Sequence, residues 1–138
     1  MISKSHAQTF TGWFIVVGHI LIILYIFLGK SDTWDIQRQI SAALTVAPVT
    51  AVYFSAVVKN FVTNAQSTAP QVYVNYNYTL ITFFIPFLLL VAVFYVCYHF
   101  PSGEFSKPEQ LQQALGALEI FLGGVVGVVV ESLFRTEK

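Results

Sequence analysis

The side chains able to do chemistry are few, and the most informative is a carboxylate inside an apolar segment. Glu119 lies within the stretch LEIFLGGVVGVVV. A charged side chain at the centre of a membrane helix costs about 2.5–3.5 kcal/mol on insertion scales, so such a residue usually faces a cavity or a partner. Three roles fit it: a group lining an aqueous pore, a proton- or substrate-coupled group in a transporter, or a protonated structural group bonded to a neighbouring helix.

Glu119 shares one face of its predicted helix with glycine and other polar residues. At about 100° per residue, these residues fall within a sector roughly 120° wide. The residues that we expect to line a pore are Gln112, Gly116, Glu119, Gly123, Gly127 and Glu131. A purely structural carboxylate would not need a polar face around it, so the pattern favours a pore in which a ring of glutamates prefers cations.

His19 is the other titratable group well inside an apolar run. One interpretation is a neutral histidine that hydrogen-bonds a neighbouring helix, and another pairs it with Glu119 as a pH-sensitive element. The three histidines are far apart, the single cysteine is Cys97, and the sequence has no H-x-x-x-H, G-x-S-x-G or glycine-rich phosphate motif. The sequence therefore predicts no enzyme activity, no metal site and no cofactor.

The composition of the chain is that of a membrane protein. Hydrophobic residues make up 56% of it, charged residues only 10%, and the formal net charge is zero. Soluble domains carry about 25% charged residues. A spanning helix needs about 20 mostly apolar residues, and several runs meet that length. The predicted spans are 12–29, 36–59, 78–100 and 107–134.

Capping patterns place the starts of two helices. Asp32 and Asp35 are three residues apart, a variant of the capping box that predicts a helix start near Thr33. Ser106 and Glu109 form the S-x-x-E pattern itself, so the last helix is expected from about residue 107.

The connector 60–77 is polar but uncharged. Its residues 71–78 alternate between valine or tyrosine on one side and tyrosine or asparagine on the other. Two interpretations remain open. One is a short strand at the level of the lipid headgroups, and the other is an extended linker with interfacial tyrosines.

The second and third spans differ in character. In the second, small residues recur every four positions, a pattern typical of close helix packing. These residues are Ala43, Ala47, Ala51 and Ser55. The third span is apolar on all sides, which predicts a helix that faces lipid.

The sequence predicts an all-α membrane protein with a single transmembrane domain, residues 1–138, of four helices joined by short connectors. Four helices are too few to enclose a pathway and still present apolar outer faces to lipid. A pore therefore implies a homo-oligomer with the fourth helix of each subunit at the axis, and we expect about four or five subunits.

The predicted function is a small homo-oligomeric channel, cation-selective and gated by a ligand or partner protein. The alternatives are a membrane anchor or sensor subunit of a larger complex, and a small proton-coupled transporter. Expected partners are the lipid bilayer, further copies of the chain, permeant ions and the gating ligand or protein. Small channels without a sensory domain are associated with bacterial toxins and defence effectors of the inner membrane. The distribution of Lys and Arg leans towards cytoplasmic termini.

Overall fold

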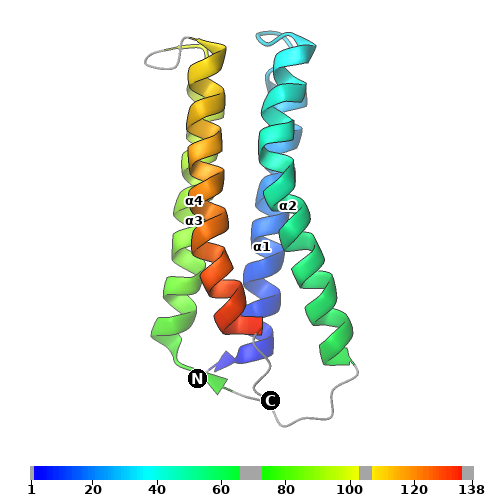
Figure 1. Ribbon diagram of the computed structural model, residues 1–138, viewed down its shortest axis with the longest axis vertical. Helices are drawn as coiled ribbons and strands as arrows, with labels where there is room; N and C mark the ends of the chain where they lie inside the picture. The colour runs from blue at the N-terminus through cyan, green and yellow to red at the C-terminus, as the bar shows by residue number, and fades with distance from the viewer. Residues whose placement is uncertain (1, 66–72, 103–106, 135–138) are drawn as a thin grey trace.

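The computed structural model is helical over most of its length (Figure 1). It describes residues 2–65, 73–102 and 107–134. The long helices are α1 (Lys4–Leu24), α2 (Ile36–Ala65), α3 (Tyr76–His99) and α4 (Pro108–Phe134). A π-helical turn, η1 (Tyr25–Gly29), continues α1.

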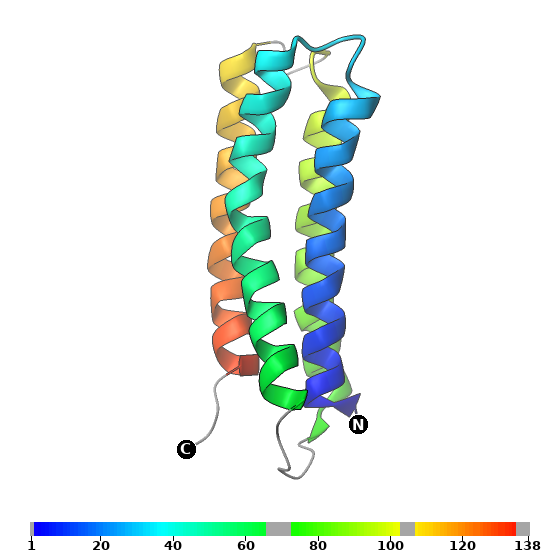
Figure 2. The ribbon, with the colours of Figure 1, turned by 90° about the vertical axis from the view of Figure 1, so that its right-hand side faces the viewer.

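The four long helices form a bundle of two hairpins (Figures 1 and 2). The first hairpin is α1 with α2, and the second is α3 with α4. Within the bundle α1 also packs against α3, and α2 packs against α4. Helices α1 and α4 are diagonal neighbours that meet across the centre of the bundle. Side chains that join them therefore lie in the bundle interior.

Three segments of the bundle are long and apolar enough to cross a membrane: His6–Gly29, Ile36–Lys59 and Thr79–His99. These confirm the helical fold class and fit an integral membrane protein. The predicted fourth span, in α4, is not among these three.

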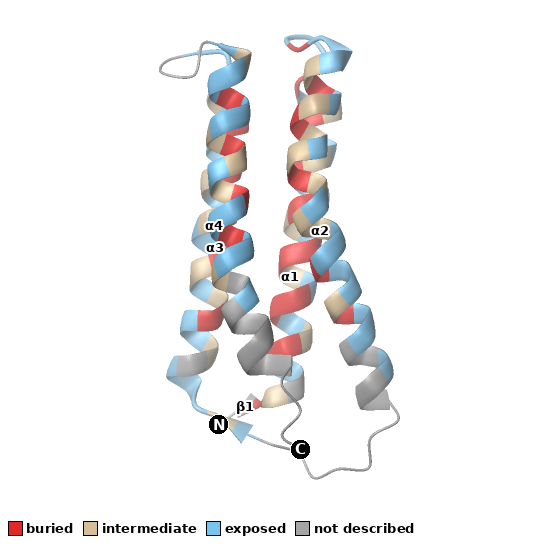
Figure 3. Ribbon diagram, viewed as in Figure 1, coloured by how far each residue is buried: buried red, intermediate tan, exposed pale blue. Residues whose placement is uncertain are grey.

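Large apolar side chains cover the outside of the bundle, whereas buried residues follow the inward faces of the helices (Figure 3). Leu28 is 74% exposed and Ile120 is 78% exposed. Apolar surface on this scale marks contact with a membrane or another protein. Helix α3 is not lipid-facing all round as the sequence predicts, because it buries Leu90, Val93 and Cys97 in the bundle.

The helix starts differ in detail from the predicted ones. The Asp35 carboxylate accepts a hydrogen bond from the Arg38 N–H at 2.9 Å. Asp35 therefore caps α2, and the start near Thr33 is wrong by three residues, since the second aspartate of the pair is the cap. At the start of α4, Ser106 lies outside the described residues. The Lys107 N–H donates instead to the Gln110 side chain at 3.1 Å, which is one half of a capping box.

Two short strands pair at the end of the bundle where the N-terminus lies (Figure 1). Strand β1 (Ile2–Ser3) pairs antiparallel with β2 (Tyr73–Val74). The predicted strand in the alternating stretch is confirmed at Tyr73–Val74, and its continuation to residue 78 is wrong because α3 begins at Tyr76. Residues 71 and 72 lie outside the described part. The partner strand at the N-terminus was not predicted, because two residues give no periodic signal.

At the opposite end of the bundle, Lys30 joins the two hairpins. Its ammonium group donates to the carbonyl oxygens of Tyr98 at 2.7 Å and Phe100 at 3.0 Å. The Trp34 indole N–H donates to the same Phe100 carbonyl at 3.3 Å. The connector after α1 is thereby fixed to the end of α3, where the helix dipole favours a positive charge.

Aromatic rings surround this ammonium group. The rings of Tyr25, Trp34 and Tyr98 lie 5.7 to 5.9 Å from Lys30 Nζ, within the range of cation–π attraction. Lys30 is only 9% exposed, and burial lowers the pKa of its ammonium group from the usual value. We call Lys30, Trp34 and the carbonyls of Tyr98 and Phe100 the lysine clamp.

Replacing Lys30 by Met should open this clamp. The Tyr98 carbonyl loses its side-chain donor, and we expect the free energy of unfolding in detergent micelles to fall by about 2 kcal/mol. Lys107→Met, at an exposed lysine near the same end, is the matched control and should change stability little. Equal stability of the two variants, followed by circular dichroism during denaturation, would contradict the clamp.

Candidate functional site

The structure brings His19 of α1 and Glu119 of α4 together inside the bundle. The Nε2 atom of His19 lies 3.4 Å from Oε2 of Glu119. The histidine side chain is fully buried, and the glutamate is 4% exposed. The two residues that the sequence left as a possible pair therefore meet where α1 and α4 cross the centre of the bundle.

Both residues occupy core positions of helix faces that are mainly apolar. Buried residues recur every three or four positions along each helix, which is the spacing of one helical face. The buried positions around the pair are Ile15, Val16, His19 and Ile22 in α1, and Leu111, Leu115, Glu119 and Leu122 in α4. Since hydrophobic burial orients both helices, the two polar side chains are turned inward with their apolar neighbours.

The hydrogen bonds of His19 determine which ring nitrogen carries a proton. Its Nδ1 atom lies 2.8 Å from the carbonyl oxygen of Ile15, one turn earlier in the same helix. A carbonyl oxygen only accepts hydrogen bonds, so Nδ1 is the donor and carries a proton. In neutral imidazole the other nitrogen, Nε2, then presents a lone pair, and this lone pair faces Glu119.

This arrangement requires a further proton between the two side chains. An ionised Glu119 and a bare Nε2 would both present lone pairs to each other, which is repulsive. A single proton removes the conflict, either as imidazolium with carboxylate or as imidazole with carboxylic acid, and both forms have zero net charge. At 3.4 Å the pair is slightly longer than the usual hydrogen bond, and neither Nε2 nor the two carboxyl oxygens have a hydrogen-bond partner within the described residues.

The other two helices also contribute titratable side chains to this site. The ring of Tyr53, from α2, lies parallel to the His19 ring with centroids 6.5 Å apart, and Tyr53 is 3% exposed. Cys97, from α3, is buried in the same core cluster as Ile22 and Leu115, which lie about one helical turn from His19 and Glu119. The sequence analysis did not select Tyr53, although it is the one tyrosine in the second predicted span. We call His19, Tyr53, Cys97 and Glu119 the central cluster.

The glycines that were predicted to share the face of Glu119 have a different environment. A Cβ atom built at Gly116, Gly123, Gly124 or Gly127 would meet nothing within 4 Å. Gly123 and Gly127 are exposed, and Gly116 is half-buried. Glu119 is only about 40° from Gly123 around the helix, yet it points into the bundle. The side chain of Glu131 lies outside the described residues.

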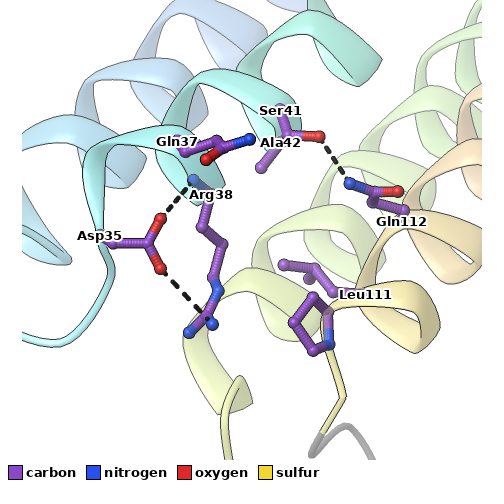
Figure 4. A pocket seen from close by; sticks show the side chains of 8 residues that line it. Asp35, Gln37, Arg38, Ser41, Ala42, Leu111 and Gln112 are labelled. Carbon is purple, nitrogen blue, oxygen red and sulfur yellow. Dashed lines mark hydrogen bonds and ion pairs between the residues drawn. The ribbon is translucent and has the colours of Figure 1, made fainter.

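Gln112 lies at the end of the bundle where the lysine clamp is found. Its amide donates a hydrogen bond to the Ser41 hydroxyl of α2 (Figure 4). The two residues border a shallow hollow of about 280 Å³ that also contains an ion pair, Arg38 with Asp35 at 3.5 Å. The Arg38 guanidinium also lies 5.4 Å from the Phe100 ring centroid, so the hollow adjoins the clamp.

The stripe of small residues on α2 runs beside the main packing face of that helix. Ala43 and Ala47 are half-buried, while Ala51 and Ser55 are exposed. The Ser55 hydroxyl donates to the Ala51 carbonyl of its own helix at 2.8 Å. Within the described residues, the rest of the chain therefore covers Ala43 and Ala47 in part and leaves Ala51 and Ser55 exposed.

Comparisons with known proteins found no similarity: no protein-family model, curated protein or solved structure matches this chain. Within the described residues, no group of three or more His, Cys, Asp or Glu side chains is placed to hold a metal ion. The members of the central cluster are an imidazole, a carboxyl, a phenol and a thiol, and each of these groups can bind and release a proton.

A double-mutant cycle tests the central pair. His19→Leu alone leaves the Glu119 carboxyl buried without its partner, and we expect a loss of about 3 kcal/mol in the free energy of unfolding. The combined His19→Leu/Glu119→Leu variant should recover most of that loss, since two apolar groups of similar volume replace the pair. The measurement is denaturant unfolding in detergent micelles. Additive losses in the double variant would show that the two side chains do not interact.

Proposed function

We propose that the protein is a small homo-oligomeric membrane channel in which α4 of each subunit faces a shared axis and cations pass along it. The observation that carries this proposal is the open glycine face of α4 beside a buried carboxyl group that is paired with His19. Permeant ions, the surrounding bilayer and further copies of the chain are its partners.

The length and position of α4 support a fourth membrane span. The helix has 27 residues, which corresponds to about 40 Å at 1.5 Å per residue and exceeds a hydrocarbon core of about 30 Å. It packs against both α2 and α3, which each contain a candidate span. Its acidic residue Glu119 is paired with His19, so the main electrostatic obstacle to insertion is reduced.

The glycine face supports assembly around α4. Small residues allow membrane helices to approach closely, and this packing replaces the hydrophobic driving force that lipid does not provide. At Gly123 and Gly127 the described residues leave open space where a neighbour would fit. Exposed small residues on the adjacent helix α2, Ala51 and Ser55, extend the surface on which a second copy can pack.

The proposed cation preference rests on the kinds of groups near this face. Glu119 is a source of negative charge about 40° around α4 from Gly123. Gln112 and Ser41 add an amide and a hydroxyl at one end of the helix. A pathway bordered by carboxyl, amide and hydroxyl oxygens favours cations over anions.

A second candidate function is a small proton-coupled transporter. It is favoured by the burial of Glu119 against His19 of the same chain, since a carboxyl that alternates between a partner and substrate is typical of such carriers. Current recordings separate the two functions. A channel gives unitary currents, whereas a carrier gives slow flux with a fixed number of protons per substrate.

Accessibility of introduced cysteines tests the channel. In a Cys97→Ala background, we expect Gly123→Cys and Gly127→Cys to react with a hydrophilic thiol reagent and to lose conductance on reaction. Leu88→Cys and Val91→Cys, at exposed apolar positions of α3, are the matched controls and should stay unreactive because they face lipid. The measurement is current across a planar bilayer before and after the reagent.

Two results would count against this proposal. If the four cysteines react equally, α4 does not face water more than α3 does. If the glycine-site cysteines react without any change in current, the glycine face is wet but is not the conducting pathway.

A further inference from the structure

We infer that His19 and Glu119 form a buried proton-binding site, and that loss of its proton opens the pathway along α4. The second half of this inference rests on the proposed channel function, whereas the proton site itself does not. The ligand is a single proton held between Nε2 of His19 and the Glu119 carboxyl group, 3.4 Å apart.

The number of protons follows from the hydrogen bonds. Nδ1 of His19 keeps its own proton because it donates to the Ile15 carbonyl at 2.8 Å. One further proton makes the pair neutral and mutually attractive. When that proton leaves, a carboxylate faces the Nε2 lone pair inside an apolar bundle, and a buried charge without a partner is strongly unfavourable.

The surroundings offer little to stabilise that negative charge. Tyr53 from α2 stacks on the His19 ring, and within the described residues Cys97 is the buried titratable side chain of α3. Both are neutral when they carry their protons. Within the described residues, His19 is the one ion-pair partner of Glu119. The carboxylate is therefore driven to leave the centre of the bundle once it is ionised.

The shortest way out is around α4 itself. Gly123 is about 40° from Glu119 around the helix, so a modest rotation moves the Glu119 carboxylate from His19 towards Gly123. Within the described residues, a Cβ atom at Gly123 would meet nothing within 4 Å, so there is room for the carboxylate beside it. The same rotation adds a negative charge to the proposed cation pathway. The protonated pair thus corresponds to the closed state and the ionised carboxylate to the open state.

Planar bilayer recordings over about pH 5 to 9, spanning the histidine range, test this assignment. Wild-type conductance should rise with pH, by about tenfold or more per pH unit on the closed side, which is the slope of at least one proton. Glu119→Gln should remain closed throughout, because its amide N–H permanently supplies the donor to Nε2. Glu109→Gln, the same change at an exposed position in the first turn of α4, is the matched control and should keep the wild-type profile.

Infrared difference spectra between acid and alkaline samples provide a second readout that needs no current. The carboxyl and imidazole bands of the pair should appear in the wild type and in Glu109→Gln, and should be lost in Glu119→Gln. Helix content by circular dichroism confirms that the variants are folded.

The outcomes distinguish the proton site from the channel. Titrating bands without any current would support the proton site and contradict the channel. A conducting wild type whose pH profile and difference spectrum are unchanged by Glu119→Gln would overturn the proton site and leave the channel standing. A Glu119→Gln variant that is open at every pH would overturn the assignment of the protonated pair to the closed state.

Discussion

The structure depends on one constraint: a basic nitrogen and a carboxyl group face each other in a bundle interior where the described residues offer them no other partner. His19 and Glu119 are both buried, and 3.4 Å separates their nearest polar atoms. Hydrophobic burial orients α1 and α4, diagonal neighbours in the bundle, so that these two polar groups meet. Their contact persists only while a proton lies between them, so the packing of the bundle core is linked to proton binding.

At its two ends the bundle is held together by specific hydrogen bonds. Between the ends, α4 has open space beside its glycines. At one end the lysine clamp ties the connector after α1 to the end of α3. At the other end β1 pairs with β2 and joins the N-terminus to the start of α3. Neither device holds α4, whose outer face carries glycines with no neighbour within 4 Å of their Cβ positions. Helix α4 is therefore the element best able to change its rotation when the central pair changes charge.

Much of this arrangement could be predicted from the sequence, because hydrophobic length and helical period are local properties. They predict the helices and select Glu119 and His19 as buried polar groups. They do not predict which edge of the polar sector faces inward, since Glu119 and Gly123 differ by only about 40° and the packing of α4 on its neighbours decides between them. The lysine clamp could not be predicted from the sequence for another reason. Lys30 bonds carbonyls that are 68 and 70 residues away, and no local pattern encodes such a pairing.

Nitrogen-15 NMR of histidine-labelled protein in lipid bilayers measures the central claim directly. At neutral pH, His19 should show a protonated Nδ1 and an Nε2 that shares a proton with a Glu119 carboxyl oxygen. On raising the pH, Nε2 should change to the unprotonated form while Nδ1 keeps its proton. A His19 whose Nε2 carries the ring proton throughout, with Nδ1 bare, would contradict the account, because no shared proton would then be required.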